Sequence, residues 1–217
     1  MEHLHRQCAA LFDFDGVVMD TETQYTWFWE EIGKKYDIGI PDFGRVIKGQ
    51  TLTQIYEKYF ADRKEDIPAI TDELNRFEKQ MQYEYVPGVV EFIHDLRRNG
   101  VATAIVTSSN AAKMEKVFAV HPELHTLTDR ILTAECFTRS KPAPDCFLLG
   151  AEQLQVHPDR CVVFEDSFHG LQAGNAAGMT VVGLATTNPE AAIRPFCKEV
   201  IPDFRHYSFE KMAALLA

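Results

Sequence analysis

The sequence predicts an α/β fold, in which a doubly wound parallel sheet carries an inserted helical domain. Two observations lead to this prediction. Short segments rich in aliphatic and β-branched residues recur along the 217-residue chain, with segments of helical periodicity between them. The first of these segments is separated from Pro87 by roughly 70 residues without a convincing buried strand, far more than a usual crossover between parallel strands needs.

The expected strands are residues 8–13, 101–107, 130–134, 161–165 and 180–185. Residues 161–165 are continuously apolar up to Glu165, as expected for a strand that is buried on both faces of a parallel sheet. Two expected helices, at 89–96 and 171–177, are followed by Gly100 and Gly178, which are typical helix ends. This alternation indicates a Rossmann-like sheet with helices on both faces.

The long connection contains patterns for three helices. Thr21-x-x-Gln24 and Thr51-x-x-Gln54 both match the capping box, and each precedes apolar residues at helical spacing. A third helix is expected from Ile70 to Met81. Its aromatic and apolar residues are the core of a small helical domain rather than a ligand box. The expected boundaries are 21–85 for the helical domain, and 1–20 with 86–217 for the α/β domain.

Composition and charge exclude several classes of protein. The formal net charge is -10 and no basic stripe offsets it, which argues against nucleic acid as a partner. No segment is long and apolar enough to span a bilayer, and the first residues lack the apolar stretch of a secretory signal. Five cysteines without a Cys-x-x-Cys pair give no disulfide framework or zinc site. We expect a monomeric cytoplasmic protein without membrane or nucleic-acid partners.

Two carboxylates, Asp13 and Asp15, follow the first predicted strand and precede Gly16. If the extended geometry continues past the strand, both side chains project the same way and repel each other, unless a divalent cation binds. One of them would then be free to act as a nucleophile. Asp-x-Asp-Gly is equally a common turn sequence. A calcium-binding loop fits less well, because Val17 and Val18 replace the expected ligand and glycine.

Three other strand-to-helix junctions carry chemical groups. Residues 107–110, Thr-Ser-Ser-Asn, offer hydroxyls and backbone N–H groups for a phosphate, or a plain helix cap. Lys141 lies beside Pro142 and near Pro144, so it is either a fixed cation or a solvated lysine. Glu165 and Asp166 offer oxygen ligands to a hard metal such as Mg²⁺, or cap the next helix. Because all four junctions share one sheet edge, we favour a phosphate-handling site.

These motifs together resemble those of the haloacid dehalogenase superfamily, in its β-phosphoglucomutase-like branch with a helical cap inserted after the first strand. The resemblance spans essentially the whole chain. Residues 140–145, Ser-Lys-Pro-Ala-Pro-Asp, are especially typical of this branch. The resemblance implies that Asp13 is the nucleophile and Asp15 the acid–base group, while Thr107 and Lys141 bind the phosphate. It implies Mg²⁺ held by Asp13, the backbone carbonyl of Asp15, and Asp166, with Glu165 in or beside the shell.

The family implies an enzyme that acts on small phosphorylated metabolites. We expect a Mg²⁺-dependent phosphatase that works through an aspartyl phosphate, with a sugar phosphate as the expected substrate. The alternative is a β-phosphoglucomutase. Its pattern has a histidine and an arginine where this chain has Tyr25 and Leu52, the latter after the cap-loop glycine Gly49. A non-enzymatic sensor of phosphorylated metabolites is a third reading. Residues expected to bind substrate or phosphate are Thr21, Lys48, Thr107, Ser108, Asn110 and Lys141, and Arg45 and Gln50 are either further contacts or plain surface.

Overall fold

The computed structural model describes residues 8–48 and 50–217, so Gly49 and the N-terminal residues 1–7 lie outside the description. Its centre is one fully parallel sheet in the order β3-β2-β1-β4-β5-β6. The strands are β1 (Ala9–Phe12), β2 (Ala102–Val106), β3 (Arg130–Leu132), β4 (Cys161–Glu165), β5 (Thr180–Leu184) and β6 (Glu199–Ile201). The five predicted strands are confirmed. The sixth, β6, is a short edge strand that the sequence analysis missed.

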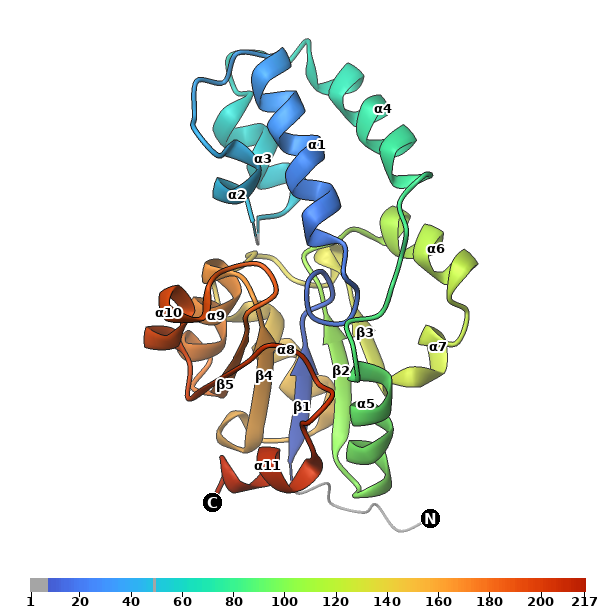
Figure 1. Ribbon diagram of the computed structural model, residues 1–217, viewed down its shortest axis with the longest axis vertical. Coiled ribbons are helices and arrows are strands. Elements are labelled where there is room, and N and C mark those ends of the chain that lie inside the picture. The colour runs from blue at the N-terminus through green and yellow to red at the C-terminus, as the bar shows by residue number, and fades with distance from the viewer. Residues whose placement is uncertain (1–7, 49) are drawn as a thin grey trace.

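Helices cover both faces of the sheet (Figure 1), so the predicted doubly wound α/β architecture is confirmed. One apolar cluster joins the sheet to α5 (Val89–Arg98), α6 (Ala111–Val120), α7 (Leu124–Leu127) and α11 (Phe209–Ala214). The other joins it to α8 (Asp145–Leu154), α9 (Phe168–Ala176) and α10 (Glu190–Ile193). Three short 3-10 turns, Ala134–Cys136, Pro158–Arg160 and Arg194–Phe196, complete the connections. The central strand β1 is fully buried, because β2 and β4 flank it and helices cover both its faces.

The inserted segment forms α1 (Glu22–Lys35), α2 (Phe43–Val46), α3 (Leu52–Tyr59) and α4 (Ile67–Glu78), which share an apolar cluster of their own. The capping box at Thr51 and Gln54 is present. The box predicted at Thr21 is wrong: Thr21 has a helical backbone conformation, and its hydroxyl donates to Asp15 instead of capping α1. Helix α4 ends at Glu78, so Met81, expected inside it, lies beyond its end.

The two connections between the sheet domain and the inserted helices run side by side. The Asp20 N–H donates to the Glu84 carbonyl at 2.8 Å, and the Val86 N–H donates to the Val18 carbonyl at 3.0 Å. Because the chain leaves and returns through these paired segments, α1–α4 lie over the end of the sheet at which β1, β2 and β4 finish (Figure 1). We refer to α1–α4 as the cap.

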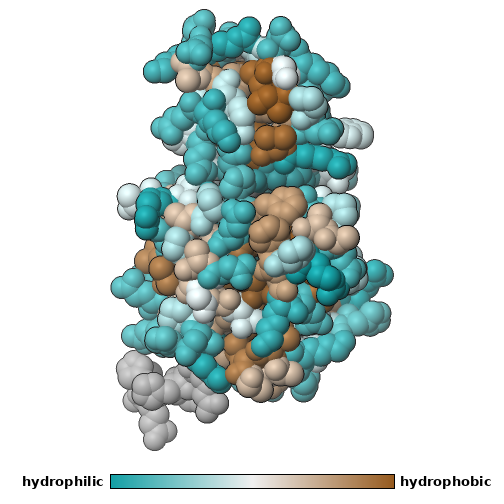
Figure 2. Space-filling model, turned by 90° about the vertical axis from the view of Figure 1, so that its left-hand side faces the viewer, coloured by the Kyte–Doolittle hydropathy of each residue, from teal (hydrophilic) through white to brown (hydrophobic). Residues whose placement is uncertain are grey.

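Polar side chains dominate the face of the molecule in Figure 2, on both the cap and the sheet domain, and apolar side chains are confined to small areas. Within residues 8–48 and 50–217, no helix combines the length and the apolar character that crossing a membrane requires.

Candidate active site

A cleft of about 980 Å³ lies between the cap and the carboxyl ends of the strands. In a parallel α/β sheet these ends form one edge, where ligands usually bind. Asp13 follows β1, Thr107 follows β2 and Asp166 follows β4, and all three line the cleft. Residues separated widely in the chain are therefore brought to one place, as the sequence analysis expected.

Lys141 lies beneath the cleft with its side chain only 1% exposed. Its Nζ donates to Oδ1 of Asp13 at 2.5 Å and to Oε1 of Glu165 at 2.8 Å. Burial lowers the pKa of this ammonium, but the two carboxylates outweigh burial and raise the pKa above its ordinary value. Lys141 is therefore a fixed buried cation beside Asp13, and the alternative of a solvated lysine is excluded.

Asp13 and Glu165 face Lys141 in different ways. The pKa of the Asp13 carboxyl is raised to about 7, and burial is the largest cause. The Lys141 ammonium lowers this pKa, whereas the negative charge of Glu165 raises it further. Glu165 uses its second oxygen, Oε2, to accept from the backbone N–H groups of Asp166 and Ser167 at 2.8 and 2.7 Å. Both Glu165 oxygens are thus occupied. This carboxylate fits a place beside a metal shell better than a place in it.

Asp166 is the carboxylate best placed to ligate a metal. It is 2% exposed, and among the described residues its Oδ2 makes no hydrogen bond. Burial, followed by the charges of Glu165, Glu22 and Asp13, raises its pKa well above the ordinary range. One oxygen each from Asp13, Glu165 and Asp166 lies within 4.8 Å of the others. A buried, all-oxygen set with an orphaned carboxylate oxygen fits Mg²⁺, which relieves both the repulsion and the missing contact.

Gly16 allows the Asp166 carboxylate to approach the loop after β1. Its φ is +77°, a left-handed conformation that favours glycine, and a Cβ placed there would lie 2.2 Å from Oδ2 of Asp166. The chain bends at Phe14 and turns at Gly16 rather than staying extended. The extended geometry that would make Asp13 and Asp15 project together, as on a strand, therefore does not continue past β1. The two carboxylates have separate partners, Lys141 for Asp13 and Lys113 for Asp15.

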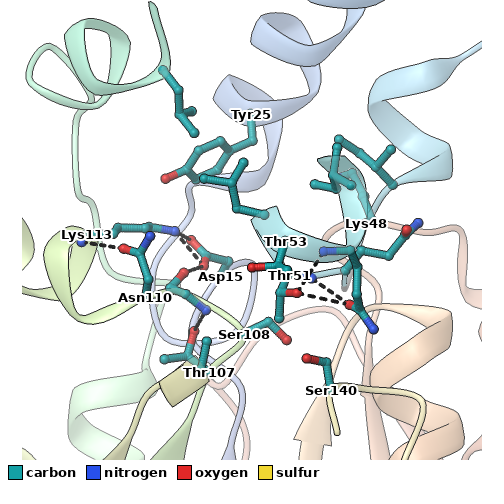
Figure 3. Close-up of a pocket in the computed structure, with 18 of the residues that line it drawn as sticks. Asp15, Tyr25, Lys48, Thr51, Thr53, Thr107, Ser108, Asn110, Lys113 and Ser140 are labelled. Carbon is teal, nitrogen blue, oxygen red and sulfur yellow. Dashed lines mark hydrogen bonds and ion pairs between the residues drawn. The ribbon is translucent and has the colours of Figure 1, made fainter. Parts of the chain in front are cut away.

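Asp15 is held by three side chains from different segments. Its Oδ2 accepts from the Ser109 hydroxyl at 2.7 Å and its Oδ1 accepts from the Thr21 hydroxyl. The Lys113 ammonium lies 2.6 Å from both oxygens (Figure 3). Burial raises the pKa of this carboxyl, but the ammonium and the three hydrogen-bond partners outweigh it, so the pKa lies below its ordinary value. The sequence analysis missed Lys113 and Ser109.

The loop after β2 opens α6 as expected. The Thr107 Oγ1 accepts from the Ser109 N–H at 2.9 Å, which tightens the turn. The Asn110 Oδ1 accepts from the Lys113 N–H at 2.8 Å, so Asn110 is the helix N-cap, the plainer of its two predicted roles. Thr107, Ser108 and Asn110 all line the cleft beside Asp15 (Figure 3).

Cap residues close the cleft from above. Lys48 lies 2.5 Å from Glu22 Oε2, and its backbone carbonyl accepts from the His169 ring at 2.9 Å. Gln54 donates to the Lys141 carbonyl at 3.4 Å, a second link from the cap to the sheet domain. Gln50 lines the cleft, whereas Arg45 is exposed and does not. The sequence analysis expected Lys48 at the site and left Gln50 and Arg45 open between a substrate contact and plain surface.

Tyr25 and Leu52, at the two positions that distinguish mutases, both line the cleft. The Tyr25 hydroxyl donates to Glu78 Oε1 at 3.0 Å, and its ring lies over the Lys113 ammonium at 4.3 Å. Burial, with the nearby Asp15 and Glu78 charges, raises the Tyr25 pKa well above its ordinary value. Tyr25 is therefore a packed, neutral side chain rather than an acid–base group.

Comparison with known proteins identifies the family of the chain. The sequence profile of the haloacid dehalogenase-like hydrolases matches residues 10–184. The fructose-1-phosphate phosphatase YqaB of Escherichia coli is 32% identical over 188 residues, covering 82% of this chain and 96% of that protein. A β-phosphoglucomutase of Bacillus subtilis is 28% identical over 195 residues, covering 83% and 84%. The crystal structure of a family IA, variant 3 hydrolase from Entamoeba histolytica superposes with a TM-score of 0.82 at 24% identity, covering 97% and 99%.

The chain thus belongs to the haloacid dehalogenase-like hydrolases, and its fold is the one that the family resemblance implied. The predicted β-phosphoglucomutase-like and phosphatase branch is also confirmed. In class, the protein is a phosphoric monoester hydrolase.

Proposed function

We propose that this enzyme is a Mg²⁺-dependent phosphatase of a small phosphorylated metabolite and that it works through a phosphorylated Asp13. The observation that carries the proposal is the contact between Asp13 and the buried Lys141, beside the unpartnered Asp166 oxygen, at the floor of a capped cleft. A carboxylate with a fixed cation and free space above it is suited to nucleophilic attack on phosphorus.

In the first step, an Asp13 oxygen attacks phosphorus and the bond to the ester oxygen breaks. Asp15 supplies the proton that this leaving oxygen takes up. In the second step, Asp15 takes a proton from water, the water oxygen attacks the phosphorus of the aspartyl phosphate, and Asp13 is released with free phosphate. Lys141 balances the charge on Asp13 and the phosphoryl oxygens, and the hydroxyls of Thr107 and Ser108 hold the remaining oxygens.

Mg²⁺ would be held by Asp13, the Asp15 carbonyl and Asp166, with Glu165 beside it, and would offset the negative charge of the phosphate. Glu165 fixes Lys141 from the side away from the cleft. Asn110 shapes the phosphate loop as the cap of α6. Thr21 is buried and donates to Asp15, so it supports the acid–base group, and Lys48 lines the cleft from the cap.

The charge balance of the cleft favours a single phosphate on an uncharged leaving group. Among the described residues the cleft is lined by four basic side chains, each paired with an acid: Lys48 with Glu22, Lys113 with Asp15, Lys116 with Glu78 and Arg139 with Asp145. The cap side of the cleft carries the acidic Glu57, several apolar side chains and a set of neutral polar groups: Gln50, Thr51, Thr53, Gln54, Tyr56, Thr71 and Asn75. Hydroxyls and amides of this kind recognise a polyol or sugar, and within the described part of the chain the cleft offers no unpaired cation to a second anion.

The mutase alternative needs groups that retain and turn a bisphosphate. Tyr25 and Leu52 supply neither a titrating group nor a cation at the two discriminating positions. A sensor without turnover would not need both carboxylates and Lys141 together.

We further propose that residues 21–85 act as one capping unit and that the protein is a cytoplasmic monomer. All five cysteines are free, which suits a reducing compartment.

Phosphate release from a panel of sugar and polyol monophosphates, with Mg²⁺ and after chelation, tests the proposal. We expect turnover of monophosphates that depends on Mg²⁺ and exceeds turnover of the matching bisphosphates. Faster formation of glucose 6-phosphate than of free phosphate from β-glucose 1-phosphate, with a bisphosphate activator supplied, would establish the mutase. Binding of the panel without turnover would establish the sensor, and full turnover in excess chelator would refute the metal requirement.

A further inference from the structure

Lys113 makes a contact that the proposed chemistry leaves unexplained. It lies on α6, 98 residues after Asp15, and its Nζ is 2.6 Å from both oxygens of the Asp15 carboxylate. Because one nitrogen contacts both oxygens, this contact fixes the direction in which the carboxylate points, whereas its plane depends on further partners of the single oxygens. Thr21 and Ser109 hold one oxygen each, so the carboxylate has little freedom to rotate.

The surroundings of Lys113 hold its ammonium in place. The side chain is only 7% exposed, and the Nζ lies 4.3 Å from the centre of the Tyr25 ring and 5.8 Å from that of Phe14. Tyr25 belongs to the cap and Phe14 to the loop after β1, so the ammonium is between aromatic rings from both parts of the molecule. A lysine in such a place is costly to bury unless it is paired. Among the described residues, Lys113 forms its ion pair with Asp15.

Lys116, one helical turn later, provides a contrast within the same helix. Its side chain is 26% exposed, and it pairs with Glu78 of the cap at 2.6 Å rather than with a group of the loop after β1. Position on α6 therefore does not by itself direct a lysine to Asp15. The short distances from Lys113 to Asp15 reflect a specific arrangement of α6 and the loop after β1.

We propose that Lys113 is the positioning residue of Asp15, and that it orients this carboxylate for proton transfer to the leaving oxygen and from the attacking water. The proposal rests on the acid–base role given to Asp15 above. Lys113 acts through Asp15 and does not itself contact the substrate. Its removal should therefore slow the chemical steps and leave substrate affinity nearly unchanged.

The test is a cycle of four enzymes: wild type, Lys113→Met, Asp15→Asn and the double variant, each assayed with Mg²⁺ and a sugar monophosphate that the wild type hydrolyses. Methionine keeps the length and apolar stem of lysine. We expect Lys113→Met to lower kcat by about tenfold or more while KM stays within about twofold. In the Asp15→Asn background the same substitution should change kcat by less than about twofold, because the group that Lys113 orients is already lost.

Two further variants serve as controls for the loss of the Lys113 charge. Lys113→Arg keeps a charge that can contact both oxygens and should recover much of the lost kcat. Lys211→Met, at an exposed lysine of α11, controls for loss of a positive charge and should behave as wild type. If circular dichroism shows that Lys113→Met does not fold, Lys113→Gln replaces it in the four-enzyme cycle, and Lys113→Arg remains the variant that keeps the charge.

Several outcomes would overturn the positioning role. A Lys113→Met enzyme with unchanged kcat would do so, and so would one with raised KM and unchanged kcat, which would assign Lys113 to substrate binding. An equal loss of kcat in both backgrounds would show that Lys113 acts independently of Asp15. Absence of wild-type turnover, or an Asp15→Asn enzyme as fast as wild type, would instead refute the function on which the proposal rests.

Discussion

The Nζ atom of Lys141 lies 2.5 Å from Oδ1 of Asp13, although 128 residues separate the two in the chain. The contact forms because β1 and the loop before α8 meet at the same edge of the parallel sheet. It places a permanent positive charge against the carboxylate that we propose as the nucleophile. Four predictions follow from this arrangement and the groups around it, and a fifth concerns Asp13 itself.

Asp166 and Glu165 should respond differently to loss of charge. Asp166→Asn removes the carboxylate whose Oδ2 has no hydrogen bond among the described residues, so we expect Mg²⁺ affinity to fall by about tenfold or more. Glu165→Gln should affect Mg²⁺ affinity less but lower the free energy of unfolding by roughly 1–3 kcal/mol, because Glu165 pairs with Lys141 and two backbone N–H groups. Mg²⁺ titration calorimetry and urea unfolding measure the two effects. Equal loss of affinity would place both residues in the metal shell.

Stabilisation by Mg²⁺ should increase with pH. In the metal-free folded protein the Asp13 pKa is raised from 3.8 to about 7, whereas in the unfolded chain it is ordinary. Between these values the folded protein holds a proton that the unfolded chain has lost, so this group's contribution to stability falls as pH rises through that window. Mg²⁺ competes with the same proton and binds better once it is gone.

The shift in Tm caused by Mg²⁺ at about pH 8 should therefore exceed that at about pH 5.5. Asp13→Asn serves as the control, because it removes one of the two metal-site carboxyls whose pKa is raised, Asp166 being the other, and should reduce the difference. A wild-type Tm shift that is independent of pH would contradict the place of Asp13 among the metal ligands.

Gly16→Ala should disrupt the metal site. The new methyl group would lie 2.2 Å from Oδ2 of Asp166 and would push that carboxylate away, in addition to about 1–2 kcal/mol of strain from the left-handed backbone. Gly100→Ala is the matched control, since Gly100 has a φ of +75° and no atom within 4 Å of the position of a Cβ. Both variants should lose similar stability without metal, and only Gly16→Ala should lose Mg²⁺ binding and turnover. Similar turnover in the two would contradict this role of Gly16.

The chemistry at the strand ends could be predicted from the sequence because each group there follows a recognisable strand. Asp13, Thr107, Glu165 and Asp166 follow strands whose apolar runs are plain, and parallel strands bring their ends together. Lys141 stands before a helix with proline on its C-terminal side. A local pattern sufficed for these residues, because the topology of the sheet supplies the long-range contacts.

The remaining features depend on tertiary contacts that a local pattern does not contain. Thr21 begins a capping-box sequence, but its hydroxyl donates to the Asp15 carboxylate. The hydroxyl therefore does not cap the N-terminus of α1. Lys113 lies in an amphipathic helix, where sequence alone does not indicate whether a lysine faces solvent or a buried carboxylate. Strand β6 has only three residues and begins with Glu199, so it is too short for the alternation of apolar and polar residues in a strand to be recognised.

Asp15→Asn should slow both chemical steps, because an amide neither protonates the leaving oxygen nor accepts a proton from water. Help of this kind is worth about a hundredfold to ten-thousandfold. When the slow enzyme is mixed with substrate and quenched in acid, mass spectrometry should find a phosphoryl group on the peptide that contains Asp13. Turnover of Asp15→Asn at the wild-type rate would remove Asp15 from the mechanism.

Turnover by Asp13→Asn tests the covalent mechanism most directly. An amide is a poor nucleophile, so no aspartyl phosphate can form, and we predict that hydrolysis of the best monophosphate substrate falls below detection at saturating Mg²⁺. Asp13 lies beyond the end of β1, so the substitution leaves no core cavity and the circular dichroism spectrum should match that of the wild type. Near-normal turnover with an unchanged spectrum would contradict the account and would favour direct attack by water on the phosphate.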